Sequence, residues 1–371
     1  MNIGFDVAQT CQERAGCAWV ADSLARALVR NAPQHKVSLY HQFGGWINSS
    51  LAKGTMVTGP NVTMPFRDMP PAKAEQLWRE VASGKALLPG RPDIVQCNSF
   101  QAPHIPGCRL VWLAYDVSFW IHPAFTTEAN RLACQRGLLE AITRVHGILF
   151  ISEHSRQEFE RVLPGLMEQH GIQSEILPLA VRFEPPPTTS PRENYWLAVG
   201  SLEPRKNYPA LFKALEIYHA ASSHPKPLRV AGGRGWMSDQ LHRKLLALEE
   251  RGWVQYLGYV PDEELQELYQ KSFALIFPSW YEGFGLPVLE AMTCGSPVIC
   301  SHSSSLPEVG GEAPIYVPPD DAYRIAQAML QLEQSLAEYQ KRVELGRIQA
   351  SRFSWDKSAQ IALNFYQRIL K

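Results

Sequence analysis

The sequence predicts an α/β protein of two domains, each a doubly wound parallel sheet with helices on both faces. The chain has 371 residues, which is long for one hydrophobic core, because such cores stop growing at about 250 to 300 residues. Short apolar runs alternate with stretches of helical spacing in both halves of the chain. A proline-rich segment, residues 184–194, separates the two halves and is the predicted linker.

The first predicted domain spans residues 1–183. Its opening run, Asn2 to Val7, is a strand candidate that leads through a loop to apolar residues at helical spacing from Trp19 onward. A helix is predicted over residues 128–143, and the other strand candidates are 37–40, 94–97, 110–114 and 147–151. Residues 44–90 hold several prolines and show no clear pattern.

The second predicted domain spans residues 195–354, and a final amphipathic helix, 355–371, follows a break at Phe353 and Trp355. The expected strands are 195–199, 228–231, 254–257, 274–277 and 297–300. The expected helices are 209–220, 237–250, 262–270 and 287–293, and the pattern is again helical from 322 onward. Because ligands bind at the carboxyl ends of strands in open parallel sheets, two facing sheets predict a binding cleft between the domains.

Charge, hydropathy and cysteine content argue against several classes of function. Thirty-six Lys and Arg residues balance thirty-six Asp and Glu residues, so the overall charge gives no argument for nucleic-acid binding. The start of the chain lacks a basic segment followed by an apolar run, and no apolar stretch approaches the ~20 residues needed to span a bilayer. The seven cysteines are widely spaced without a C-x-x-C pair, which predicts free thiols and no zinc site. We therefore expect a cytoplasmic protein, with any membrane contact peripheral and at the inner face.

The segment from Phe277 to Ile299 is the richest in candidate binding residues, and its pattern is strand, glycine-containing loop, helix and strand. Gly283 and Gly285 allow the backbone to approach a ligand closely or to adopt positive φ. The free amides at the helix start form an anion site. Glu290 is expected in the first turn of that helix, where it can accept hydrogen bonds from ribose hydroxyls. Glu282 belongs to the loop and faces another part of the same ligand.

A second candidate element follows the first strand of this domain. Arg205 and Lys206 are expected at the carboxyl end of that strand, where a planar fork and a point charge can clamp a diphosphate and stabilise a leaving group. Two later segments offer a glycine corner at Gly232 and a strand end near Val260, and their backbone is expected to meet a nucleotide base.

These elements resemble, in order, the signature of glycosyltransferase family 4: G-x-x-x-x-R-K-N after a strand, a glycine pair, G-x-V-x-D-E-E-L, and E-x7-E. The likeness covers nearly the whole chain, and residues 278–307 are its most specific part. It implies the GT-B architecture: two Rossmann-like domains facing an interdomain cleft, the first for the acceptor and the second for a nucleotide-sugar donor. It also implies that the C-terminal helix crosses back to the first domain.

The resemblance assigns roles to the motif residues. It implies that Glu282 contacts the transferred sugar, Glu290 the ribose, and Arg205 with Lys206 the diphosphate. The backbone from Phe284 to Leu286 would hold sugar hydroxyls and phosphate. Family members retain the anomeric configuration, which implies a front-face mechanism without a protein nucleophile. The chain has no Asp-x-Asp triplet, so we expect charge neutralisation by Arg, Lys and a helix end, with no metal and no cofactor.

In the first domain, residues 113–123 are similar to the family's H-D-x-S-F-x-x-H-P segment. Tyr115 stands where the family has a histidine that contacts the donor sugar near the reacting centre. Tyrosine can still donate a hydrogen bond, so Tyr115 and Asp116 are catalytic candidates. His122 and Trp120 are candidates for the acceptor side.

Gly16 precedes the first predicted helix and matches the position where family members approach the diphosphate or the acceptor; loop geometry is the other explanation for this glycine. Relatives of the 113–123 segment use mannosyl donors, so GDP-mannose is the expected donor. The expected acceptor is a glycan or lipid-linked saccharide of cell-surface polysaccharide assembly, such as lipopolysaccharide.

Three other functions share part of this pattern. A nucleotide-sugar 2-epimerase shares the architecture, but the Glu282 to Glu290 element and the Arg-Lys pair disfavour it. A catalytically silent partner that binds a nucleotide-sugar, or stabilises an active transferase, stays open because Tyr115 replaces the histidine. A dinucleotide oxidoreductase is disfavoured, because no G-x-G-x-x-G follows the first strand.

Overall fold

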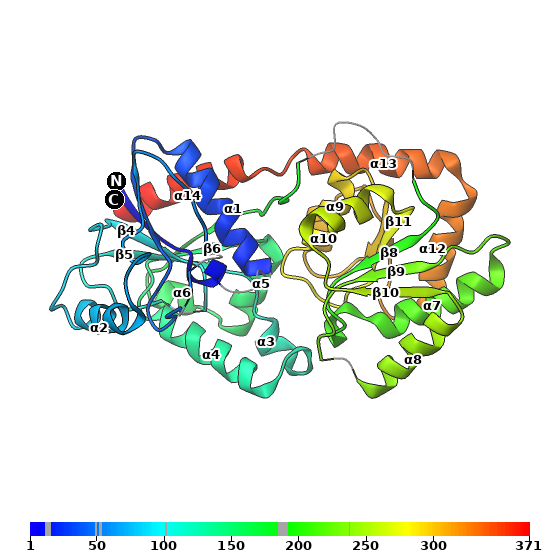
Figure 1. Cartoon of the computed structure of the whole chain (residues 1–371), viewed down its shortest axis with the longest axis horizontal. Helices are drawn as coiled ribbons and strands as arrows, with labels where there is room; N and C mark the ends of the chain where they lie inside the picture. The colour runs from blue at the N-terminus through cyan, green and yellow to red at the C-terminus, as the bar shows by residue number, and fades with distance from the viewer. Residues whose placement is uncertain (12–15, 49, 52–53, 101, 185–191, 237) are drawn as a thin grey trace. The chain divides into compact units, whose positions relative to one another are not determined.

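The computed structural model describes residues 1–11, 16–48, 50–51, 54–100, 102–184, 192–236 and 238–371. It contains two compact units, Met1–Leu179 together with Ser354–Lys371, and Ala180–Phe353 (Figure 1). The predicted linker, 184–194, falls largely on residues 185–191, which lie outside the described residues.

The first unit is built on a sheet of seven parallel strands in the order β3-β2-β1-β4-β5-β6-β7. The strands are β1 Asn2–Asp6, β2 Lys36–Tyr40, β3 Val62–Thr63, β4 Ile94–Cys97, β5 Arg109–Ala114, β6 Gly147–Phe150 and β7 Gln173–Ile176. Strands β1, β4 and β6 are mostly apolar and are buried over nearly their whole length, which is the pattern of a sheet covered by helices on each side.

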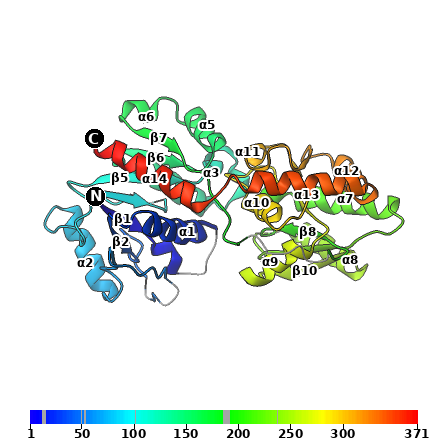
Figure 2. The same cartoon turned by 90° about the horizontal axis from the view of Figure 1, so that it is seen from above.

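The helical segments of this unit are η1 Ala8–Cys11, α1 Gly16–Asn31, α2 Pro71–Ala82, α3 Ser118–Ile121, η2 Pro123–Phe125, α4 Glu128–Ile142, α5 Glu153–Val162, α6 Leu166–Gln169 and α14 Trp355–Leu370. Helices α2 to α5 share a hydrophobic core with one face of the sheet. Helix α14 lies beside α1 (Figure 2). The Tyr366 hydroxyl of α14 donates to the Gln96 side chain of β4, so the C-terminal helix is part of the first unit.

The sequence shows no clear pattern in residues 44–90, and the described part of this segment packs around an aromatic cluster. The ring of Trp78 in α2 lies 5.5 Å from the ring of Phe66 and 5.2 Å from that of Phe43. Phe66 also contacts Tyr40 edge-on at 5.7 Å. These contacts join residues that are far apart in sequence, so local periodicity does not predict them.

The second unit has a sheet of six parallel strands in the order β10-β9-β8-β11-β12-β13. The strands are β8 Trp196–Val199, β9 Leu228–Ala231, β10 Val254–Gly258, β11 Ala274–Phe277, β12 Val298–Ser301 and β13 Ile315–Val317. Both sheets are therefore parallel and covered by helices, which confirms the predicted α/β class.

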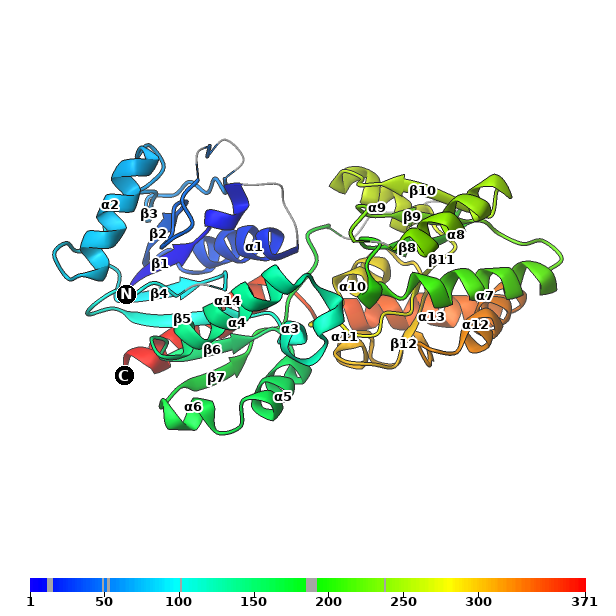
Figure 3. The same ribbon diagram turned by 90° about the horizontal axis from the view of Figure 1, so that it is seen from below.

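Its helical segments are η3 Pro204–Lys206, α7 Tyr208–Ala221, α8 Asp239–Glu250, α9 Asp262–Lys271, α10 Leu286–Thr293, α11 Leu306–Gly310, α12 Ala322–Gln334 and α13 Leu336–Ala350. Helices α7, α8 and α12 share the core on one face of the sheet, and α7 lies against α12 (Figure 3). The helical stretch after residue 322 has a break at Ser335 that the pattern did not predict; the Ser335 side chain caps α13. In the described part of the chain, no helix is long and apolar enough to cross a membrane.

Candidate functional site

The motif residues of the second unit follow parallel strands, so they lie at the carboxyl edge of its sheet. Arg205 and Lys206 follow β8, and Glu282 follows the neighbouring strand β11. The two segments are joined directly: Asn207 Nδ2 donates to the carbonyl oxygen of Pro278 at 3.0 Å, and the Trp280 amide donates to the carbonyl oxygen of Arg205 at 2.9 Å. Asn207 adopts φ of 58°, a left-handed conformation that asparagine tolerates and that turns the chain into α7.

Glu282 is the centre of a buried charge cluster. Its Oε2 accepts from Arg205 Nη1 at 2.5 Å, and its Oε1 accepts from Lys206 Nζ at 2.8 Å. Arg205 also pairs with Glu203 at 2.8 Å, and Lys206 Nζ lies 4.6 Å from the centre of the Phe277 ring. The predicted Arg-Lys pair and the predicted glutamate are therefore one site.

The charges of this cluster set the protonation of its members. Burial alone would raise the pKa of Glu282, but the positive charges of Arg205 and Lys206 outweigh burial and hold it at about 2. Burial lowers the pKa of Lys206, and the Glu282 carboxylate opposes that change. Two cations and two carboxylates are balanced here, so an incoming anion competes with Glu203 and Glu282 for the same donors.

The loop between Glu282 and α10 is fixed by two serines that the sequence interpretation did not single out. The Glu282 amide donates to Ser304 Oγ at 2.8 Å, and the Ser305 hydroxyl lies 2.8 Å from the carbonyl oxygens of Glu282 and Phe284. Gly285 has φ of 108°, and a Cβ there would lie 2.6 Å from Leu306 Cδ2. Glycine is thus required at this position, and no side chain caps the N-terminus of α10.

Glu290 departs from the expected position. Helix α10 begins at Leu286, so Glu290 lies in its second turn and not in the first, because Gly285 is the N-cap. The side chain is buried, and its partners are Arg182 Nε at 3.2 Å and the Tyr269 hydroxyl at 2.9 Å. Burial raises the pKa of Glu290, while the charge of Arg182 opposes the rise. Neither partner has a sequence signal, because Arg182 is far from the motif and Tyr269 is one aromatic residue in an amphipathic helix.

Gly232 and Val260 lie at the ends of the next two strands. A Cβ at Gly232 would lie 2.2 Å from the Gly200 carbonyl oxygen, and the Gly232 amide donates to the carbonyl oxygen of Gly258 at 2.7 Å. Close backbone approach therefore explains the glycine at 232. Val260 is buried at the end of β10. Gly200 has φ of 136°, and a Cβ at this position would lie 2.9 Å from Lys206 Cε. Glycine therefore leaves space for the Lys206 side chain.

In the first unit, Tyr115 is buried at the end of β5. Its hydroxyl lies 3.3 Å from the carbonyl oxygen of Cys17 and 3.2 Å from that of Asn98. Burial raises the pKa of Tyr115 well above its usual value, so the group is a neutral donor. Asp116 accepts from the Ser118 amide at 2.8 Å and so holds the start of α3.

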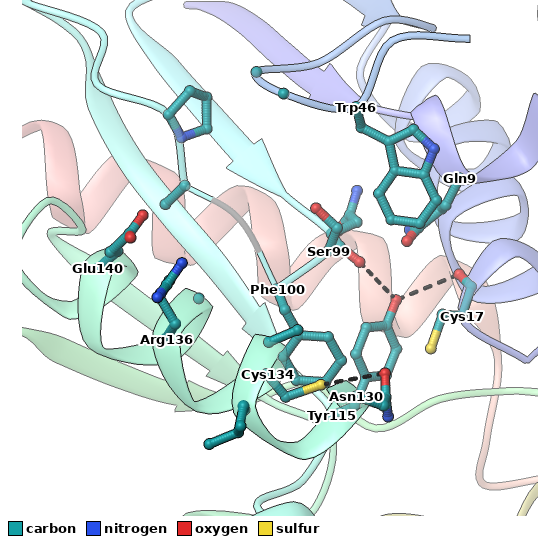
Figure 4. A pocket seen from close by; sticks show the side chains of 18 of the residues that line it. Gln9, Cys17, Trp46, Ser99, Phe100, Tyr115, Asn130, Cys134, Arg136 and Glu140 are labelled. Atoms are coloured by element: carbon teal, nitrogen blue, oxygen red, sulfur yellow. Dashed lines mark hydrogen bonds between the residues drawn. The ribbon is translucent and has the colours of Figure 1, made fainter. Parts of the chain in front are cut away.

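Tyr115 also lines a pocket of about 840 Å³ formed by residues of the first unit (Figure 4). The two acceptor-side candidates, His122 and Trp120, do not line this pocket. His122 follows α3 with its ring 4.6 Å from that of Phe125, and Trp120 packs against the hydrophobic core.

Gly16 is the first residue of α1. Its φ is not in the left-handed region, and a Cβ there would meet nothing within 4 Å, so the described structure gives no conformational reason for glycine at this position.

Comparison with known proteins identifies the family. Residues 182–348 match the family described as glycosyl transferases group 1. O-antigen chain mannosyltransferase B of Escherichia coli is 34% identical over 272 residues, covering 70% of this chain and 70% of the relative. The chain belongs to the group 1 glycosyltransferases. This glycosyltransferase is also 26% identical, over 100% of its length, to the E. coli serotype-specific mannosyltransferase WbdA, of which it spans about half, 48%.

Solved structures agree on the GT-B fold of this glycosyltransferase. Sucrose-phosphate synthase from Thermosynechococcus elongatus matches with a TM-score of 0.73 at 18% identity, covering 99% of this chain and 98% of that one. An α,α-trehalose-phosphate synthase from Burkholderia xenovorans matches with a TM-score of 0.63 at 14% identity, covering 100% of both chains. At these identities the likeness concerns the fold alone.

Proposed function

We propose that this glycosyltransferase moves a mannosyl residue from GDP-mannose to a saccharide or lipid-linked saccharide acceptor in cell-surface polysaccharide assembly. The mannosyl group is suggested by two relatives, O-antigen chain mannosyltransferase B and WbdA, which are both named as mannosyltransferases. The second unit takes the donor and the first takes the acceptor. The seven free cysteines suit a reducing compartment, which supports the proposal that the reaction takes place in the cytoplasm.

The cluster of Glu282, Arg205 and Lys206 is the observation that carries this proposal. Among the described residues, Lys206 Nζ donates one hydrogen bond, to Glu282, which leaves two of its three protons for a phosphate oxygen. The donor diphosphate would accept hydrogen bonds from these two protons and from the Arg205 guanidinium. Glu282 would then turn toward a hydroxyl of the transferred sugar. Fixed cations that meet charge developing on a leaving diphosphate stabilise the transition state.

The remaining donor contacts extend along the same sheet edge. Glu290 would accept from the ribose hydroxyls; each carboxylate oxygen has two lone pairs, so its bonds to Arg182 and Tyr269 leave room. The amides from Gly283 to Leu286, at the uncapped start of α10, would hold phosphate and sugar oxygens. Backbone near Gly232 and Val260 would meet the base.

We further propose that transfer retains the anomeric configuration and needs no metal. Arg205, Lys206 and a helix N-terminus together supply the positive charge that a divalent ion supplies elsewhere. The leaving phosphate would take the acceptor proton, so no side chain has to act as a nucleophile. This fits Tyr115, whose hydroxyl is directed to backbone carbonyls.

A second candidate is a silent partner that binds the nucleotide-sugar without turnover. The buried, already bonded Tyr115 in place of a histidine is the observation that favours it. Donor binding without product would support this candidate, and product formation excludes it.

The test is a panel of GDP-, UDP- and ADP-sugars, with and without EDTA, read by thermal shift and by release of the nucleoside diphosphate. We expect stabilisation and turnover with GDP-mannose, insensitive to EDTA and lost in Glu290→Gln and Lys206→Met. Glu344→Gln, an exposed carboxylate on α13, is the matched control and should behave as the native chain. If no nucleotide-sugar stabilised the chain, the donor-site assignment would be wrong. The product anomer, read by NMR, tests retention separately.

A further inference from the structure

The Glu290 carboxylate is held by two side chains that come from different parts of the second unit. Arg182 Nε lies 3.2 Å from Glu290 Oε1, and the Tyr269 hydroxyl donates to Oε2 at 2.9 Å. Burial and the charge of Glu290 raise the pKa of Tyr269 well above its usual value, so this hydroxyl stays a donor. The Glu290 side chain is only 4% exposed. A buried carboxylate with a different partner at each oxygen has a fixed orientation.

The guanidinium of Arg182 is itself held by a second carboxylate. Arg182 Nη1 lies 3.1 Å from Oδ1 of Asp262, which is in the first turn of α9. The Arg182 Cζ atom lies 5.1 Å from the centre of the Phe183 ring. A planar guanidinium can contact two carboxylates at once in a defined geometry, which a compact ammonium group cannot. Asp262 therefore helps to set which edge of Arg182 faces Glu290.

The segment that carries Arg182 packs on the same helix that carries Tyr269. Phe183 is buried, and its ring centre lies 6.3 Å from that of Tyr269. Gln266 Nε2 of α9 donates to the carbonyl oxygen of Glu184 at 3.0 Å. All of these residues belong to the second unit. Arg182 and Tyr269 are thus placed together by contacts that need no ligand, which lowers the cost of ordering them when a donor binds.

The charges around Glu290 suit a hydroxyl group better than a phosphate. One cation, Arg182, lies between two carboxylates, Glu290 and Asp262. Lys206, whose charge also acts on Glu290, is already paired with Glu282. Each Glu290 oxygen has two lone pairs and one partner, so at least one lone pair is left on each. Two neighbouring acceptor positions match a ligand with two neighbouring hydroxyls, such as the 2′,3′-diol of a ribose.

We propose that Arg182 and Tyr269 are positioning residues that present both Glu290 oxygens to the two ribose hydroxyls, and that they thereby select ribonucleotide donors over deoxyribonucleotide donors. The assignment rests on the proposed function and adds two specificity determinants to its donor site. Asp262 acts one step further away, through Arg182.

The test compares nucleotides that differ by one hydroxyl. The probes are GDP, UDP and ADP with their 2′-deoxy and 3′-deoxy forms, and Kd is measured by calorimetry on the full chain for the nucleotide that binds most tightly and for its two deoxy forms. We expect the native chain to bind each deoxy form about tenfold more weakly or worse, because a site built to bond a hydroxyl rejects the analogue that lacks it. This Kd ratio is a property of folded molecules, so a loss of stability alone does not change it.

Four variants assign the ratio to its residues. Arg182→Met and Tyr269→Phe should weaken binding of the ribonucleotide and lower the ratio at least about threefold. Arg182→Lys keeps a cation but lacks the planar fork, so its ratio should lie between those of Arg182→Met and the native chain. Arg229→Met removes another arginine of the same unit, paired with Glu193 at 3.1 Å, and is the control that should keep the native ratio.

The outcomes separate this inference from the proposed function. A native ratio in both Arg182→Met and Tyr269→Phe would overturn the positioning role, and so would equal affinity of the native chain for the ribonucleotide and both deoxy forms. Loss of ribonucleotide binding in Lys206→Met would in either case leave the proposed donor site standing. If the native chain bound none of the nucleotides, the proposed donor site would be wrong, and the positioning role would fall with it.

Discussion

Glu282 is a buried acid whose charge depends on two neighbouring cations. Its pKa falls from 4.5 to about 2 in the folded chain, which corresponds to about 3 kcal/mol of stability. Because the folded pKa is the lower one, this contribution is complete above pH ~4.5 and is lost as the pH falls toward ~2. We predict that Glu282→Gln is destabilising at pH 7 and that its difference from the native chain shrinks below pH ~4.5.

Denaturant unfolding of both proteins between pH 7 and pH 3 measures this difference. The exposed Glu344→Gln variant controls for the loss of one carboxylate elsewhere. A difference that stays constant across the whole pH range would show that Arg205 and Lys206 do not hold the Glu282 charge in place.

Arg182 and Glu290 form a second buried pair. Removing one partner should lower the free energy of unfolding more than removing both. Arg182→Met leaves the Glu290 carboxylate buried without its cation, and such losses amount to about 3 to 5 kcal/mol. Arg182→Met combined with Glu290→Gln should recover a large part of this, since the only carboxylate that then lacks its cation is the half-buried Asp262, the other partner of Arg182 at 3.1 Å. A double-mutant cycle of unfolding free energies at pH 7 measures the coupling. Additive losses would contradict a direct pairing of the two side chains.

The loop between β11 and α10 depends on a glycine for two separate reasons. Gly285 has φ of 108°, and a Cβ there would lie 2.6 Å from Leu306 Cδ2. Gly252 shares positive φ, at 70°, but a Cβ there would meet nothing within 4 Å. We predict that Gly252→Ala costs about 1 kcal/mol, from the backbone alone, and that Gly285→Ala costs clearly more. Thermal unfolding of the two variants measures the difference, and equal losses would remove the steric part of the argument.

Much of the second unit could be predicted at the level of its elements. The predicted strands at 228–231 and 274–277 coincide with β9 and β11, because a buried parallel strand is a short apolar run bounded by turn residues. The Arg-Lys pair and Glu282 could be placed together, because parallel strands bring their carboxyl ends to one edge. The second-turn position of Glu290 could not, since it depends on where α10 begins.

The elements and residues that the sequence missed depend on long-range contacts. Helix α2 is held by rings from residues 43 and 66. Arg182 reaches Glu290 across more than a hundred positions of sequence. A single sequence gives periodicity and local turn chemistry, and neither specifies such pairings.

For the whole molecule, the proposed function assigns one ligand to each of the two units. Each unit has its own parallel sheet and its own hydrophobic core, so a ligand that binds one unit stabilises that unit's segments directly. The donor contacts proposed for Arg205, Lys206 and Glu282 lie in the second unit, and Tyr115 with its pocket lies in the first.

Hydrogen exchange on the full chain can read the two units separately. We predict that GDP slows amide exchange several-fold in residues 200–207 and 282–290, because the diphosphate closes the uncapped start of α10 and the end of β8. A mannobiose should instead slow exchange in segments of the first unit, which is proposed to take the acceptor. If GDP protected no amide between 282 and 290, the donor would not bind at this sheet edge. If mannobiose protected the second unit alone, the first unit would not take the acceptor.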